Sequence, residues 1–211
     1  MYTKASNAYL PSVLRTFALS LAIAFLGTAA GVFLPAGLFL PIAVLETGML
    51  LFAFFLRRRK AISYPFLYVF TFLSGVTTFP IVAHYTAAAG GNTVFLALAT
   101  TVTVFSGLSI YAAKTKKDLS FLGGMLLAAL LALIAISIFS IFWPLSSTAM
   151  LAYSFIGVLV FSGYVLFDIN MMKQHGVREE DVPMMALSLY LDFINLFISL
   201  LRIFGIISSR D

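Results

Sequence analysis

The sequence predicts an all-α integral membrane protein with seven transmembrane helices, and two observations carry that prediction. The first is composition: 62% of the 211 residues are hydrophobic, 10% are charged and the mean hydropathy is +1.06. Soluble domains are roughly 45–50% apolar and about 25% charged. The second is a series of apolar runs near the ~20 residues that a helix needs to cross about 30 Å of hydrocarbon. These runs lack the two-residue alternation of a membrane barrel, which excludes that alternative.

Short polar segments divide the apolar runs and place the helix ends. Pro35, Gly90-Gly91-Asn92 and Trp143-Pro144 are helix-breaking or turn-forming sequences between runs. The first run is too long for a cleavable signal peptide, so we expect it to be the first span. We therefore predict a single domain over residues 1–211 with spans at 12–33, 36–56, 62–84, 93–113, 119–142, 148–172 and 183–207.

The distribution of lysine and arginine predicts the orientation of the chain. Cytoplasmic loops of membrane proteins are enriched in these residues. With the N-terminus inside, eleven of the thirteen basic residues fall on the cytoplasmic side, and the C-terminus lies outside. The net charge of +5 is thus explained by topology and lipid headgroups rather than by nucleic acid. The cytoplasmic set is Lys4, Arg15, Arg57, Arg58, Arg59, Lys60, Lys114, Lys116, Lys117, Lys173 and Arg178, whereas Arg202 and Arg210 lie towards the other side.

Three acidic residues fall inside predicted spans: Glu46, Asp168 and Asp192. A carboxylate at membrane depth costs at least a few kcal/mol, so it normally faces a partner or water. From the helical rise, Asp168 lies about 6 Å and Asp192 about 13 Å from the cytoplasmic side of their helices. Helix tilt absorbs the difference, and helices joined by a short loop usually pack as neighbours. We therefore expect Asp168 and Asp192 to meet, and we call them the aspartate pair.

Two carboxylates in contact cannot both ionise at low cost in a medium of low dielectric. They share a proton and titrate as a unit. The expected product is a proton-sensitive latch, because the deprotonated pair repels and either separates or recruits a cation.

The seventh predicted helix carries a polar stripe that supports this interpretation. Its five members follow one another at spacings of four, three, four and three residues, which places them on one face. A helix that faces lipid has no use for such a face, so we expect it to point into the bundle. The stripe consists of Ser188, Asp192, Asn195, Ser199 and Arg202.

Glu46 and Arg57 share a face of the second predicted helix. Arg57 lies at a level from which it can reach Asp168, so we predict that it is a third member of the latch. Arg202 is the basic residue beyond the midplane that can reach Glu46. Structural ion pairs that hold helices together are the alternative for both contacts. We expect Asn195 and Ser188, with Glu46 and Arg202, to line an ion pathway or to form such pairs.

The remaining residue types mainly argue against metal sites and common enzyme motifs. The chain has no cysteine, and its two histidines are too far apart in the sequence for a metal site. It has neither a Gly-rich phosphate loop nor a Ser/His/Asp set, so we expect a protein that is not an enzyme and that has no cofactor. Four aromatic residues are candidate anchors at the membrane interface, namely Tyr85, Trp143, Tyr153 and Tyr190.

Several of these segments resemble the transmembrane Bax inhibitor motif family. The run LSLYLDFINLF at residues 187–197 resembles the signature helix of that family, and YVLFD at residues 164–168 resembles the end of its sixth span. RRRK at 57–60, KKDLS at 116–120, and Ser74-Gly75 with Phe79-Pro80 match its pattern too. The likeness covers essentially the whole chain, and it is strongest to the bacterial calcium-leak members.

The resemblance implies both an architecture and an activity. The architecture is a seven-helix bundle in which two triple-helix layers surround a central C-terminal helix. The activity is a pH-sensitive calcium leak controlled by an aspartate pair with a nearby arginine, which are Asp168, Asp192 and Arg57 here. Calcium is then the transported ion, which the aspartates contact through the oxygen ligands that it prefers. The implied partners are calcium ions, protons and membrane lipid, in what we expect to be a bacterial plasma membrane.

Two other functions use the same acids. An intramembrane aspartyl protease needs an aspartate pair on adjacent helices to activate water, but Leu189-Tyr190-Leu191 before Asp192 differs from the glycine-bearing motif of such enzymes. A proton-coupled cation antiporter would alternate access to the pair, although no inverted repeat supports it. The sequence leaves open whether acid opens or closes the path.

Overall fold

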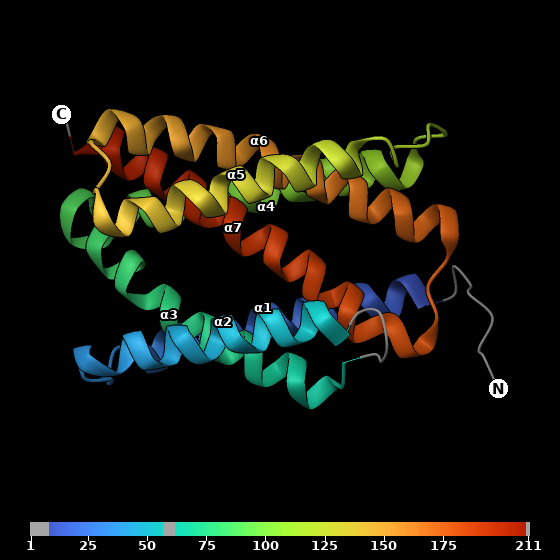
Figure 1. Ribbon diagram of the computed structural model, residues 1–211, viewed down its shortest axis with the longest axis horizontal. Coiled ribbons are helices and arrows are strands. Elements are labelled where there is room, and N and C mark those ends of the chain that lie inside the picture. The colour runs from blue at the N-terminus through green and yellow to red at the C-terminus, as the bar shows by residue number, and fades with distance from the viewer. Residues whose placement is uncertain (1–8, 57–61, 210–211) are drawn as a thin grey trace. The chain divides into compact units, whose positions relative to one another are not determined.

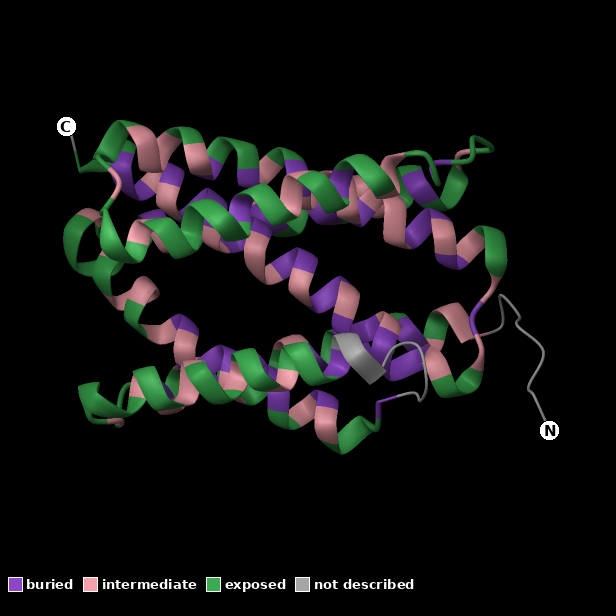
Figure 2. Ribbon diagram, viewed as in Figure 1, coloured by how far each residue is buried: buried purple, intermediate pink, exposed green. Residues whose placement is uncertain are grey.

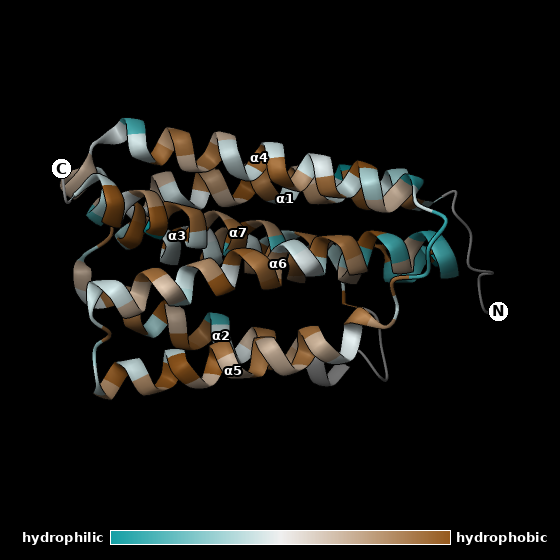
Figure 3. Ribbon diagram, turned by 90° about the horizontal axis from the view of Figure 1, so that it is seen from above, coloured by the Kyte–Doolittle hydropathy of each residue, from teal (hydrophilic) through white to brown (hydrophobic). Residues whose placement is uncertain are grey.

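The structure is a computed structural model that describes residues 9–56 and 62–209. Within these ranges seven helices are long and apolar enough to cross a membrane (Figures 1 and 3). The all-α fold with seven transmembrane helices is therefore confirmed. The helices are α1 (Leu10–Gly31), α2 (Phe39–Leu56), α3 (Tyr64–Ala89), α4 (Gly91–Lys114), α5 (Leu122–Phe142), α6 (Ser147–His175) and α7 (Val182–Ser208), with short 3-10 helices η2 (Ala36–Leu38) and η3 (Glu179–Asp181) before α2 and α7.

The largest boundary difference is at the end of α3. The helix continues to Ala89, whereas His84 was the expected last residue. It ends there because Gly90 adopts a φ of 83°, in the left-handed region that favours glycine, before α4 begins at Gly91. Pro80 lies inside α3 without ending it, which membrane helices tolerate.

The described residues form two compact units. Unit 1 comprises the chain up to Ile81 together with His175–Tyr190, and unit 2 comprises Val82–Gln174 together with the chain from Leu191 onward. Helices α3 and α7 contribute residues to both units. The single-domain organisation expected from the sequence stays a prediction.

In unit 1, α1 and α3 pack backbone against backbone. A Cβ atom on Gly75 would overlap the carbonyl oxygen of Ala24, and one on Gly27 would overlap that of Phe72. Thr28 Oγ1 bridges the same contact by donating to the Gly75 carbonyl oxygen over 3.0 Å. Small residues allow this close approach, which stabilises helix pairs in lipid through van der Waals contact.

In unit 2, glycines bring α6 against its neighbours. A Cβ atom on Gly163 would lie 2.6 Å from a methyl carbon of Leu126 on α5, and one on Gly157 would lie 2.6 Å from Ser199 Oγ on α7. The rings of Phe105 on α4 and Phe193 on α7 pack edge to face at 5.5 Å. Helix α7 thus contacts both α4 and α6 within this unit.

Burial distinguishes α7 from the other helices (Figure 2). Of the most apolar 18-residue stretch of each helix, 67% is buried inside the protein in α7, against 6% in α2 and 39% in α3. The position of α7 at the centre of the bundle stays a prediction. The arrangement of the other six helices in two triple-helix layers stays a prediction.

Candidate functional site

The polar stripe of α7 is mostly removed from the surface. Asp192 and Ser199 are buried, while Ser188, Asn195 and Arg202 are half-buried. Asn195 Nδ2 donates to the Leu191 carbonyl oxygen over 2.7 Å, and Ser199 Oγ donates to that of Asn195 over 2.7 Å. Both bonds run one turn back along the same helix. The helix itself therefore satisfies these donors.

Asp192 is the exception on this face. Asp192 is 5% exposed, and its Oδ2 atom has no hydrogen-bond partner among the described residues. Buried polar atoms normally have a partner, so an orphaned carboxylate oxygen calls for an explanation.

Asp168 lies near the end of α6, and its charge acts on Asp192. Both residues belong to unit 2, and the direct contact between them stays a prediction. Asp168 is half-buried and Asp192 is buried, and water therefore shields the interaction only in part. Arg57, the predicted third member, lies outside the described residues.

Glu46 and Arg202 each have a contact other than the predicted one. Glu46 Oε2 accepts a hydrogen bond from Thr77 Oγ1 of α3 over 2.6 Å, within unit 1. The Arg202 guanidinium carbon lies 5.8 Å from the centre of the Tyr153 ring, within unit 2, in a cation–π arrangement. The Glu46–Arg202 pair stays a prediction.

Tyr190 was expected at the membrane interface, and that expectation is wrong. The residue is 0% exposed and its ring packs edge-on against Phe70 of α3, with centroids 6.4 Å apart. Its hydroxyl group is buried near Ser74 without a well-formed hydrogen bond among the described residues. An aromatic ring on the most buried helix packs into the core, and this burial could not be inferred from residue type alone.

Asn170 is a polar residue close to the site that the sequence analysis missed. It follows Asp168 by two positions on α6, is 0% exposed and forms hydrogen bonds through both ends of its amide. An amide inside a mainly apolar span was a signal that could have drawn attention to it, because such groups need internal partners.

Comparison with known proteins gives the family. A family profile described as "Inhibitor of apoptosis-promoting Bax1" matches residues 6–209. The chain belongs to the Bax inhibitor family. An uncharacterised protein of Campylobacter jejuni is 34% identical to it, over 97% of this chain and 90% of the relative.

Two further relatives carry descriptive names. "Bax inhibitor 1" of Schizosaccharomyces pombe is 37% identical over 72% of this chain and 57% of its own length. "Inner membrane protein YbhL" of Escherichia coli is 38% identical over 65% of this chain and 60% of its own length. Together with the seven apolar helices, these matches identify a multi-pass membrane protein of the Bax inhibitor family.

The donor set of this Bax inhibitor family protein limits how it can hold a metal ion. Among the described residues, no group of three or more histidine, aspartate or glutamate side chains is arranged so that it could hold a metal ion. Two carboxyl groups are a small set for a resident calcium ion, which takes 6–8 oxygen ligands.

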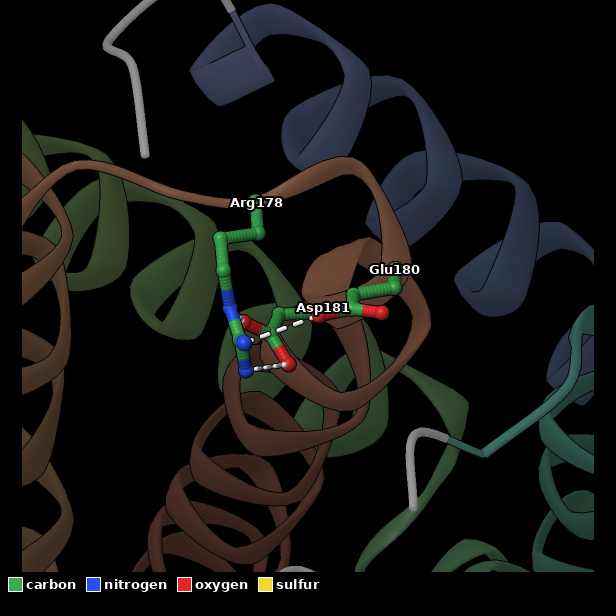
Figure 4. Close-up of polar contacts among 3 residues, drawn as sticks. All are labelled: Arg178, Glu180 and Asp181. Carbon is green, nitrogen blue, oxygen red and sulfur yellow. Dashed lines mark hydrogen bonds and ion pairs between the residues drawn. The ribbon is translucent and has the colours of Figure 1, made fainter. Parts of the chain in front are cut away.

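Glu180 and Asp181, just before α7, form ion pairs with Arg178 (Figure 4). Its Nε atom lies 2.6 Å from Asp181 Oδ2, and its Nη1 atom lies 2.8 Å from Glu180 Oε1. These side chains are 24–48% exposed, so the ion pairs contribute about 0–1 kcal/mol.

Proposed function

We propose that this Bax inhibitor family protein is a calcium-permeable leak channel whose path is controlled by protonation of Asp168 and Asp192. One observation carries the proposal: Asp192 is 5% exposed, has an Oδ2 atom without a hydrogen-bond partner among the described residues, and interacts with the charge of Asp168. A proton or a passing cation is the natural partner for that oxygen atom.

The chemistry follows from two like charges in a poorly solvated place. With one shared proton, the carboxyl groups attract each other and α6 and α7 are held together at this level. Without it, the groups repel each other, and either move apart or bind a cation between them. Carboxylate oxygens are ligands that calcium prefers, and buried acids are how cation pores favour positive ions.

Arg57 is proposed as the partner of an ionised aspartate when the pair is parted. The support is its position in the sequence, at the end of the second span and on the face that carries Glu46. We likewise propose that Glu46, Asn195, Ser188 and Arg202 lie along or beside the ion path. Thr77 supports a role for Glu46 as an oxygen ligand, because it holds that carboxylate in one orientation.

The proposed location is a bacterial plasma membrane, with the N-terminus in the cytoplasm. The distribution of basic residues supports this orientation, and the lipid headgroups of that leaflet are the proposed contacts of the exposed lysines. Calcium ions and protons are the other proposed partners.

The decisive experiment measures calcium entry into vesicles that contain the purified protein and a calcium indicator, from acid to neutral pH. We expect entry that depends on the protein and on pH. In Asp168→Asn, Asp192→Asn and the double variant, the pH response should disappear because the carboxyl groups no longer share a titrating proton. Asp181→Asn is the matched control, since it removes an acid of the loop before α7 and should titrate like wild type.

Two outcomes contradict the proposal. If no calcium enters at any pH, the protein is not a calcium leak. If the aspartate variants keep the wild-type pH response, the pair is not the proton sensor. A fixed ratio of protons moved outward per calcium ion would instead indicate an exchanger.

A further inference from the structure

Asn170 joins the end of α6 to the α4–α5 connection, which comprises residues 115–121. Asn170 Oδ1 accepts the backbone N–H of Leu119 over 3.0 Å, and Nδ2 donates to the carbonyl oxygen of Lys117 over 3.1 Å. One amide thus binds a donor and an acceptor of the same short backbone segment. Because Asn170 is 0% exposed, water does not replace these bonds when they break.

A second side chain of α6 binds the same connection. Lys173, three residues after Asn170 and therefore on the same face, donates its Nζ proton to the Thr115 carbonyl oxygen over 2.5 Å. Lysine donates here to a backbone carbonyl oxygen rather than to an acid. Three hydrogen bonds from two residues of α6 therefore end on the backbone of the α4–α5 connection.

Hydrogen bonds within the α4–α5 connection hold its backbone in one conformation, so it is a fixed point of attachment for α6. Asp118 Oδ1 accepts the backbone N–H of Ser120 over 2.8 Å, and Thr115 Oγ1 accepts that of Lys117 over 3.3 Å. Such local side-chain bonds to backbone fix the conformation of turns.

A packing contact fixes α6 on the other side of Asp168. The ring of Phe167 lies against Gly123 of α5, where a Cβ atom would stand 3.0 Å from the ring carbon Cε2. Phe167 and Asn170 thus flank Asp168 in the sequence, and both contact the segment that runs from the α4–α5 connection into α5. A rotation of α6 that turned Asp168 away from α7 would have to break these contacts.

We infer that Asn170 is a positioning residue for the aspartate pair: it fixes the rotation of α6 on the α4–α5 connection so that Asp168 faces Asp192. This inference rests on the proposed function of the pair, because Asn170 acts only through Asp168. Lys173 supports the same contact from one turn further along. Asn170 itself neither carries a titrating proton nor contacts the ion.

The test compares the pH of half-maximal calcium entry in vesicles that contain wild type, Asn170→Leu or Lys173→Met. Asn170→Leu keeps the size of the side chain and removes both amide bonds. When α6 is held less firmly, the two carboxyl groups can move apart and repel each other less. The pH of half-maximal calcium entry should therefore fall by about 0.5–1 pH unit. Lys173→Met should shift it less and in the same direction. Ser154→Ala is the matched control, because this buried α6 hydroxyl bonds inside its own helix, to the Met150 carbonyl oxygen.

A second measurement separates positioning from simple damage to the fold. Hydrogen exchange should become faster at the Leu119 amide in Asn170→Leu, while the amides of α1 exchange as in wild type. If that amide is exposed and the midpoint of calcium entry does not move, the inference is overturned although the proposed function stands. If wild type itself lacks a pH response, the proposed function fails, whatever the exchange data show. If Asn170→Leu does not fold, Lys173→Met alone must shift the midpoint, and an unmoved midpoint there overturns the inference.

Discussion

The Oδ2 atom of Asp192 is buried without a hydrogen-bond partner among the described residues, and this has an energetic consequence. An unsatisfied buried polar atom costs roughly 1–3 kcal/mol, and more when it is charged. The neighbouring charge of Asp168 adds to that cost. A chain tolerates such a residue when the group is needed for something other than stability, which agrees with a proton-binding or cation-binding role.

Asp192→Asn should therefore not weaken the fold at neutral pH, and should stabilise it by about 1 kcal/mol or more. The substitution keeps the shape of the side chain and removes the repulsion from Asp168. Denaturant unfolding in mild detergent measures the difference in the free energy of unfolding.

Asp181→Asn is the control for that measurement. It breaks the contact with Arg178 on a part-exposed surface, so it should lower the free energy of unfolding by less than about 1 kcal/mol. A loss of several kcal/mol in Asp192→Asn would mean instead that the carboxylate has an essential structural partner.

Individual residues show which parts of the site could be predicted from the sequence and which could not. The two aspartates were found because charge inside a span is conspicuous. The contact of Glu46 was not foreseen, because it is the hydroxyl group of Thr77 and hydroxyl groups are common in membrane helices. Hydrogen bonds of this kind depend on which helix faces meet, and a charge count does not contain that information.

At the scale of elements, hydropathy located every helix to within a few residues, because the membrane sets a minimum length for each span. It could not locate the contacts between helices. The close approach of α1 and α3 depends on Gly75 and Gly27, yet a glycine in a span can also lie where nothing touches it. Gly48 of α2 is such a case, with no atom within 4 Å of an added Cβ.

These two glycines make a matched pair of variants. Gly75→Ala should destabilise the protein by about 1–3 kcal/mol or more, since the new methyl group overlaps the Ala24 carbonyl oxygen and α1 must move. Gly48→Ala should be neutral or stabilising by up to about 1 kcal/mol, because alanine favours the helix and meets open space.

Denaturant unfolding of the two alanine variants in the same detergent measures both effects. Equal stability of the two variants would contradict the backbone contact between α1 and α3.

For the whole molecule, the distribution of charge along the chain leads to a prediction about the membrane rather than about the fold. Eleven of thirteen basic residues fall on one side when the N-terminus is placed inside, and an odd number of spans then puts the C-terminus outside. The helices themselves carry no such information, since an apolar segment can cross in either direction.

Reporter fusions test this orientation in bacteria. Green fluorescent protein should fluoresce on the N-terminus and not on the C-terminus, whereas alkaline phosphatase should be active on the C-terminus alone. The reverse pattern, or both ends on one side, would contradict seven spans with the N-terminus inside.

The direction of the hydrogen bonds on α6 and α7 has a consequence for motion. Asn195 and Ser199 donate within α7, so sliding or turning this helix against α6 breaks neither bond. Asn170 and Lys173 instead bind α6 to another segment, and moving α6 breaks three bonds. These five hydrogen bonds therefore oppose a displacement of α6 but not a displacement of α7, which is held in unit 2 by its packing against α4 and α6.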